Sequence, residues 1–300
     1  MKLAHYLKEG KVRVAIVKEE RLHDLSESSG LAGDPIPADM TIDSILETAR
    51  LDGLVQSADS LTKGKGAPLL EFKLKSPILS PEKILLVAVN YISHSKEQNI
   101  QPPQFPYYFT KFRNALIGPD EPIIVPKVSS KVDWEVELAV IIGKQGKYIS
   151  RARASEYVAG YAVSNDISFR DFQYPPGWPE KLNPLGMNWV KGKALDSSFP
   201  LGPWLVTKDE VPNPQNLKLR LRVNGETKQD SSTSEMVFDV SELIEYISAG
   251  MTLKPGDIIS TGTPLGVSLW GAQRFLGDGD TVEAEVEGIG VLRNRVQREV

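Results

Sequence analysis

Short runs rich in apolar residues, separated by polar turns, open the chain, and this pattern predicts β-strands. Strands are expected over residues 2–7, 12–17 and 22–25. A helix is predicted from about Ile42 to Leu51, with Thr41 placed to cap it and Gly53 to end it. Residues 60–68 are polar and Gly-rich, which indicates a linker. Together these elements predict a small N-terminal α+β domain over residues 1–70.

Residues 71–300 are richer still in predicted strands. These are expected over residues 84–89, 134–142, 157–164, 217–223, 257–260 and 281–286. One clear helix, residues 241–249, interrupts them; Asp239 and Glu242 have the spacing of a capping box, and Gly250 follows. Many strands and few helices predict a mainly β (α+β) fold, with a catalytic domain built as a roll or barrel of mixed sheets.

Composition narrows the function classes. The chain has 300 residues, a formal net charge of −4 and 41% hydrophobic residues, the balance of an ordinary globular protein without a basic nucleic-acid footprint. Its longest clean apolar run is far short of the ~20 residues that span a bilayer, and its N-terminus lacks the apolar segment of a signal peptide. We therefore expect a cytoplasmic protein with no nucleic-acid or membrane partner.

The metal-binding residue types are also restricted. The chain has no cysteine, which excludes disulfides, thiolate ligands and a cysteine nucleophile. It has three histidines, His5, His23 and His94, which argues against a His-rich zinc site. A metal ion in this protein would be held mainly by oxygen, and oxygen ligands favour Mg²⁺, Mn²⁺ or Ca²⁺.

Acidic residues recur at every second position in the strand predicted over residues 134–142. Asp133, Glu135 and Glu137 would share one face of it, opposite a wholly apolar face. Neighbouring carboxylates repel each other unless a cation lies among them, so a divalent metal is one explanation and a solvated acidic face is the other. The same spacing recurs at Glu283, Glu285 and Glu287, so spacing alone does not choose between the two strands.

Motifs in the rest of the chain favour the first strand. From about Pro77 to Val296 the sequence resembles the fumarylacetoacetate hydrolase superfamily. The motifs follow the family's order: Val89–Glu97, Asp133–Leu138, Asn165–Gln173, Lys191–Asp196, Pro200–Pro203, Val223–Glu226, Lys254–Asp257 and Thr261–Pro264. The first seventy residues are also similar to the small domain of two-domain microbial members.

The resemblance implies a metal centre and a catalytic lysine. It assigns Glu135, Glu137 and Asp166 as ligands of Mg²⁺ or Mn²⁺, in a site that stabilises negative charge on an enolate. Lys193 matches the family's active-site lysine, which stabilises that charge or moves a proton. Lys191 would share the face of Lys193 if the segment were extended, so the assignment between the two stays open.

The resemblance also implies substrate contacts. Arg170 and Gln173 match positions that hold the substrate, and Arg170 suits a bidentate contact with a carboxylate. Thr263 could bind a substrate carboxylate through its hydroxyl group, with Gly262 letting the backbone approach the ligand closely. The alternatives are a surface loop at Arg170 and a simple turn at Thr263.

A His-Glu pair is the strongest indication of the reaction type. His94 and Glu97 have the i, i+3 spacing of one helix face. In hydrolytic relatives such a pair lies on a lid and activates water, and the polar, Pro-rich residues 98–106 agree with a lid loop. The Pro-rich segment 174–188 is longer than the usual family link, and we expect it to shape specificity.

These features predict an enzyme that acts on a small oxo-acid. We favour hydrolysis of a C–C bond in a β-diketo acid of the acylpyruvate or fumarylpyruvate type. The alternatives are a 2-hydroxyhepta-2,4-diene-1,7-dioate isomerase, an oxo-acid decarboxylase and a dehydratase of 2-keto-3-deoxy sugar acids; a protein that only binds a small acid is a further one. The family also leads us to expect a homodimer.

Overall fold

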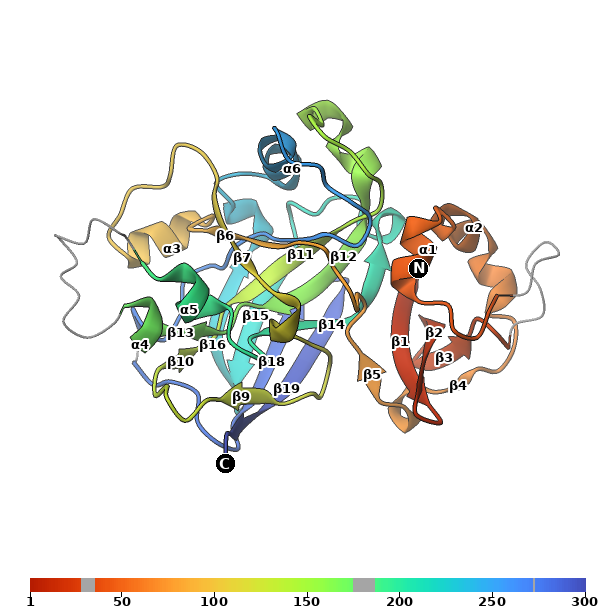
Figure 1. Cartoon of the computed structure of the whole chain (residues 1–300), viewed down its shortest axis with the longest axis horizontal. Coiled ribbons are helices and arrows are strands. Elements are labelled where there is room, and N and C mark those ends of the chain that lie inside the picture. The colour runs from red at the N-terminus through yellow and green to blue at the C-terminus, as the bar shows by residue number, and fades with distance from the viewer. Residues whose placement is uncertain (28–35, 175–186, 272) are drawn as a thin grey trace.

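The N-terminal strands belong to the same sheet as the strands that carry the acidic residues. The computed structural model describes residues 1–27, 36–174, 187–271 and 273–300, and it is mainly β, as the sequence predicts (Figure 1). The main path of its largest sheet runs β4-β3-β2-β1-β14-β12-β11-β17-β6-β7, with β5 paired to β1 and β8 to β14. Its strands are β1 (Lys2–Lys8), β2 (Lys11–Lys18), β3 (Arg21–Asp24), β4 (Ala67–Pro68), β5 (Leu74–Lys75), β6 (Ile84–Ala88), β7 (Tyr107–Lys111), β8 (Leu116–Ile117), β11 (Val136–Ile142), β12 (Val158–Asn165), β14 (Phe199–Thr207) and β17 (Ile258–Ser260).

A second sheet packs against β11, β12 and β14. Its strand order is β16-β15-β18-β19-β9, and a separate two-stranded ladder pairs β10 with β13. These strands are β9 (Ile123–Val125), β10 (Val132–Asp133), β13 (Ser168–Phe169), β15 (Lys218–Val223), β16 (Glu226–Ser232), β18 (Thr281–Val286) and β19 (Gly290–Arg298). Buried side chains such as Leu138, Leu221 and Ala284 fill the space between the two sheets, which is the usual way for sheets to bury one face each.

The helices are short and lie around the sheets. They are α1 (Ile42–Glu47), α2 (Leu51–Leu61), α3 (Ile92–Glu97), α4 (Arg170–Gln173), α5 (Trp189–Lys193) and α6 (Val240–Ser248). The predicted capping box of α6 is confirmed, because Asp239 and Glu242 each accept a hydrogen bond from the other's backbone N–H. The side chain of Thr41 caps α1, also as predicted. Within the described ranges, no helix is long and apolar enough to span a membrane.

Three predictions for the N-terminal region need correction. The helix expected from Ile42 to Leu51 is two helices, because Ala49 has a φ of +55° and turns the chain between them. Gly53 does not end a helix but lies within α2, where burial of Leu54 and Leu61 outweighs its weak helix propensity. The expected linker at residues 60–68 is also partly structured, since it holds the end of α2 and strand β4.

His5 is a buried histidine that connects β1 to α1. Its Nδ1 lies 2.9 Å from the carbonyl oxygen of Ser76, and the backbone N–H of Ile42 donates to its Nε2 at 2.8 Å. Since Nε2 is an acceptor, the ring proton must be on Nδ1 and the ring must be neutral. Burial lowers the pKa of His5, against a smaller opposing effect of the Ser76 carbonyl.

We therefore predict that the free energy of unfolding falls as the pH drops below about 6.5, the ordinary pKa of histidine. Below that value the unfolded chain binds a proton that folded His5 does not, which costs up to ~1.4 kcal/mol per pH unit until the folded-state pKa is reached. Urea denaturation of the parent and of His5→Gln, at pH 7 and pH 5, measures the effect. Burial also lowers the pKa of His23, but His23 is present in both proteins and cancels. Equal pH dependence in the two proteins would contradict the prediction.

Candidate metal and substrate site

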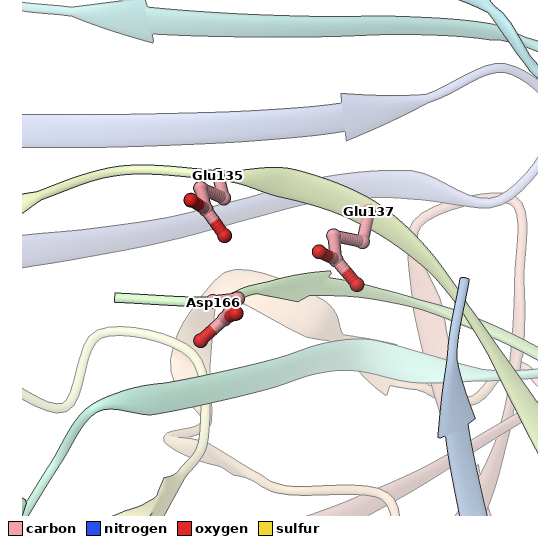
Figure 2. A group of neighbouring side chains, drawn as sticks. All are labelled: Glu135, Glu137 and Asp166. Atoms are coloured by element: carbon pink, nitrogen blue, oxygen red, sulfur yellow. The ribbon is translucent and has the colours of Figure 1, made fainter. Parts of the chain in front are cut away.

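Three carboxylates converge where β11 and β12 meet. Glu135 immediately precedes β11, Glu137 lies within it, and Asp166 follows the last residue of β12. The antiparallel register places Val136 opposite Asn165, so the three side chains come together (Figure 2). An oxygen atom of each lies within 4.8 Å of an oxygen atom of the others.

The site is buried rather than solvated. Glu135, Glu137 and Asp166 are 5%, 1% and 1% exposed, which excludes the solvated acidic face that the sequence left open. The predicted strand also starts later than expected, at Val136, and both of its faces are buried. The second acidic strand differs, because Glu285 is partly exposed and forms a 2.7 Å ion pair with Arg222. Among the described residues, Glu135, Glu137 and Asp166 form the one carboxylate group with metal-binding spacing.

Two predicted site residues neutralise these carboxylates. Lys193 Nζ lies 2.6 Å from Oε2 of Glu135 and 2.7 Å from Oδ2 of Asp166. Arg170 donates to Oε1 of Glu135 at 2.5 Å and to Oδ2 of Asp133 at 2.9 Å. Arg170 is 4% exposed, so the surface-loop alternative for this residue is wrong. Asp133 faces Arg170 and the N–H groups of residues 268 and 269 rather than joining the carboxylate group.

Lys111 is a third buried cation, and the sequence analysis did not single it out. It is 1% exposed and ends strand β7. Its Nζ lies 2.7 Å from Oδ1 of Asp166 and donates to the backbone carbonyls of Ile167, at 2.8 Å, and Ser198. A single lysine does not by itself predict a buried position. The available signal was that Lys111 would share one face of a strand with Tyr107 and Phe109.

The surroundings shift the pKa values of the three carboxyl groups in different directions. Burial alone would raise the pKa of Glu135, but Lys193 and Arg170 lower it to about 2. Burial and the nearby Asp166 and Glu135 carboxylates raise the pKa of Glu137 well above its ordinary value. Burial also raises the pKa of Asp166, against the opposing effect of Lys111 and Lys193. Two of the three carboxyl groups are therefore harder to ionise than in water, and a bound cation would favour their ionised forms.

The donor set fits a hard divalent cation. All three side chains offer carboxylate oxygens, the ligands that Mg²⁺ and Mn²⁺ prefer. Oδ1 of Asp166 is buried and lies 2.7 Å from Lys111 Nζ, so a metal ion would add to a charge partner that is already present.

The ambiguity between the two lysines is resolved by their backbone. Residues 189–193 form α5 rather than an extended segment, so Lys191 and Lys193 do not share a face. Lys193 is buried among the carboxylates, whereas Lys191 is exposed and lies over the ring of Phe172, 4.8 Å from its centroid. The expectation that the two lysines could share a face is wrong.

His94 and Glu97 form the expected pair on α3. Nδ1 of His94 lies 3.0 Å from Oε2 of Glu97, whose other oxygen accepts the N–H of Gly266 at 3.0 Å. Nε2 of His94 lies 2.7 Å from the side-chain nitrogen of Gln98. A carboxylate only accepts, so the proton is on Nδ1 and the lone pair of Nε2 is directed at the Gln98 amide. This is the tautomer that a general base requires.

The residues predicted to contact the substrate lie in the same site, and their side chains already form hydrogen bonds within the protein. Gln173 accepts a hydrogen bond from Arg170 at 2.9 Å. The hydroxyl of Thr263 donates to the carbonyl of Val136 and accepts from Gln229, both at 2.9 Å. Thr263 is therefore held in place by residues from other strands, and not by a simple turn alone.

Gly262 lies where the backbone packs closely against two other residues. Its φ is +91°, and a Cβ atom there would lie 2.9 Å from Cβ of Asn90 and from the carbonyl oxygen of Val87. Its N–H donates to Oε2 of Glu137 at 3.0 Å, and the hydroxyl of Ser260 donates to the same oxygen. Glycine is therefore required by packing within the protein, and its predicted role in close approach to a ligand remains a prediction.

A cavity of about 420 Å³ opens onto the carboxylates, a volume typical of small-molecule sites. Eight of the nine predicted site residues line it: His94, Glu135, Glu137, Asp166, Arg170, Gln173, Lys193 and Thr263. Glu97 does not line the cavity but supports His94. The Pro-rich segment 174–188 lies mostly outside the described residues, although Tyr174 and Met187 line the cavity. Its predicted role in specificity remains a prediction.

Comparison with known proteins agrees with the sequence motifs. The family model described as "Fumarylacetoacetate (FAA) hydrolase C-terminal" matches residues 83–297. A mitochondrial oxaloacetate tautomerase of Bos taurus is 47% identical over 230 residues, which cover 76% of this chain and 71% of that protein.

Solved structures cover the whole chain. A 2-hydroxyhepta-2,4-diene-1,7-dioate isomerase of Mycobacterium marinum has a TM-score of 0.74 and 34% identity, over 100% of this chain and 99% of that one. A maleylpyruvate hydrolase of Sphingobium sp. SYK-6, in complex with manganese(II) and pyruvate, has a TM-score of 0.80 and 31% identity, over 100% of both chains. The family model and the relatives confirm the resemblance, and the chain belongs to the fumarylacetoacetate hydrolase family.

Proposed function

We propose that this protein is a divalent-metal-dependent enzyme that hydrolyses a C–C bond in a β-diketo acid of the acylpyruvate type. The observation that carries the proposal is His94, which lines the same cavity as the three carboxylates and is held by Glu97. Enolate chemistry needs only charge stabilisation and a proton carrier, whereas hydrolysis also needs a base for water. This site offers one, in the tautomer that can accept a proton.

Glu135, Glu137 and Asp166 would hold Mg²⁺ or Mn²⁺. Once bound, such an ion supplies Lewis-acid stabilisation of negative charge on the 2-oxo group. The solved hydrolase of Sphingobium that contains manganese and pyruvate supports this choice of ion. Lys193 contacts two of the three carboxylates, so its ammonium group is placed to stabilise the charge that develops beside them.

Hydrolysis would proceed in a defined order. Nε2 of His94 takes a proton from water, and Glu97 stabilises the imidazolium through Nδ1. The water oxygen adds to the distal carbonyl carbon, and the C–C bond breaks with its electron pair passing to the pyruvate fragment as an enolate. That enolate takes up a proton at carbon, giving pyruvate and a carboxylic acid. Gln98 must release Nε2 first, since its amide occupies that atom.

Substrate contacts are proposed for Arg170, Gln173 and Thr263. Arg170 carries five N–H groups, and its hydrogen bonds to Asp133, Glu135 and Gln173 use three of them. Two N–H groups remain for a substrate carboxylate. The hydroxyl of Thr263 donates to the carbonyl of Val136 in the free protein, so it would have to turn away from that carbonyl to donate to a substrate oxygen.

A second candidate function is the interconversion of keto and enol forms of an oxo-acid. It is favoured by the curated relatives of Bos taurus, oxaloacetate tautomerases that are 47% identical over 230 residues. Tautomerisation uses the same carboxylates and Lys193 but requires no attack by water. His94 therefore separates the two functions experimentally.

The first prediction concerns the metal ligands. Glu135→Ala should abolish the thermal stabilisation that Mg²⁺ or Mn²⁺ gives the parent, because it removes a ligand oxygen from the site. A chelator should likewise abolish activity, and added metal should restore it. Glu285→Ala is the matched control, and it should keep the metal-dependent shift in melting temperature. The ligand assignment is wrong if the control loses the shift and Glu135→Ala keeps it.

The second prediction concerns the two lysines of α5. Lys193→Met should lower kcat by about 10²–10³, the usual cost of losing one preorganised charge-stabilising group. Lys191→Met should change kcat by no more than a few-fold, because Lys191 is exposed and contacts Phe172 rather than the carboxylates. Steady-state kinetics at saturating metal measure both. Equal losses would mean that the role does not belong to Lys193 alone.

The third prediction separates hydrolysis from tautomerisation. His94→Ala should slow cleavage of an acylpyruvate by about 10²–10⁴, the usual contribution of a general base. Metal affinity should change little, because His94 is not a proposed ligand. Deuterium uptake at the carbon next to the keto group, followed by NMR, should persist if the metal and Lys193 suffice for enolisation.

The control for that prediction is built into its two readouts. A variant that loses both cleavage and deuterium uptake would show that His94 serves enolisation itself. A variant that keeps cleavage within a few-fold of the parent would exclude His94 as the water base, and tautomerisation would become the preferred function.

A further inference from the structure

The cavity has a polar floor and an apolar mouth, and the side chains along strand β7 follow this change from apolar to charged. Tyr107, Phe109 and Lys111 alternate along one face of β7. Tyr107 is 48% exposed, Phe109 is partly buried, and Lys111 is 1% exposed beside Asp166. The strand therefore runs from solvent, past two aromatic rings, to the carboxylates.

Helix α5 repeats this arrangement. Trp189 and Lys193 are four residues apart and share a face. Trp189 is partly exposed, whereas Lys193 is buried. The ring of Trp189 stacks on Phe109 at 4.7 Å and lies 5.6 Å from Tyr107, and Lys193 Nζ lies 5.3 Å from the centroid of Phe109. Two separate elements thus place an aromatic side chain nearer the mouth of the cavity and a lysine nearer its floor.

The rest of the mouth is apolar or neutral. Aliphatic and aromatic side chains line it, together with two glutamines: Gln98, Ile100, Gln101, Pro103, Phe105, Met187 and Trp270. In the described part of the lining, the basic residues are His94, Arg170 and Lys193. Each of these already faces a carboxylate of the protein, at 3.0 Å or less.

We infer that the group opposite the oxo-acid end of the substrate is apolar and carries no second carboxylate. A substrate whose 2-oxo acid lies at the carboxylates must extend its other end past Phe109 and Trp189. With Arg170 engaged by the carboxylate of the 2-oxo acid, the described residues of the lining leave no cation for a carboxylate at that end, which would lose water without compensation. An alkyl or aryl group would gain burial against the aromatic rings.

This inference rests on the proposed function, because it takes the carboxylate floor as the site of the 2-oxo acid. It selects acylpyruvates with an alkyl or aryl acyl group over dicarboxylic oxo-acids such as oxaloacetate. It also identifies Tyr107, Phe109 and Trp189 as the residues that determine specificity.

Two oxo-acids of matched shape test the inference. In 5-methyl-2-oxohexanoate an isopropyl group replaces the distal carboxylate of 2-oxoglutarate, so the pair differs in charge but little in size. Their binding to the Mn²⁺-saturated protein is measured by calorimetry, with oxalate as a ligand that reaches only the floor. Each buried methyl group contributes a factor of about four, so the alkyl acid should bind at least about tenfold more tightly.

A positive charge introduced at the mouth sharpens the test. Tyr107→Arg supplies the missing cation at a half-exposed position, and it should reduce the preference for the alkyl acid by at least about fivefold. Oxalate binding should stay within twofold of the parent, which also shows that the variant is folded. Phe112→Arg is the control: Phe112 is 50% exposed, follows β7 and does not line the cavity. It should leave the preference unchanged.

Each outcome has one meaning. If oxalate fails to bind in the presence of Mn²⁺, the proposed function is wrong. If oxalate binds but 2-oxoglutarate binds as tightly as the alkyl acid, or more tightly, the inference is overturned and the proposed function stands. If Tyr107→Arg and Phe112→Arg change the preference equally, the effect is long-range charge and the apolar mouth does not determine specificity.

Discussion

The structure of this site depends on the balance of buried charge. The carboxyl groups of Asp133, Glu135, Glu137 and Asp166 all belong to residues that are no more than 5% exposed. An unpaired charge in such a place costs several kcal/mol, so every ionised group needs a partner at short range. Three buried cations supply them: Lys111, Arg170 and Lys193. Glu137 forms no ion pair among the described residues, and burial together with the neighbouring Asp166 and Glu135 carboxylates raises its pKa.

The fold meets this requirement by bringing several separate elements to one point. β11 and β12 place the acids through their antiparallel register, while β7, α4 and α5 each contribute one cation. The backbone is fixed in turn by the charges, because Lys111 donates to the carbonyls of Ile167 and Ser198. Fold and site therefore stabilise each other. A change in any one partner leaves an opposite charge buried, so its effect extends beyond the contact removed.

The cavity separates two groups of residues. Its floor holds the charged groups, which under the proposed function would stabilise an enolate, and relatives of this chain include an isomerase and a hydrolase. His94 lines the cavity beside that floor and is the proposed base for water. We infer that the aromatic mouth selects the substrate, so reaction and substrate could vary without altering the carboxylates.

The sequence by itself determined the local features and the identity of the acids. The sequence predicted the capping at Thr41 and Asp239 and most of the strands, because backbone preferences depend on residues close together in the chain. It also predicted the convergence of Glu135, Glu137 and Asp166, because family motifs identify them. The tertiary structure alone decided which acidic strand is buried. It also decided that residues 189–193 are helical, and that Lys111 contacts Ile167, 56 positions away. Such contacts depend on how distant elements pack, and no local pattern encodes them.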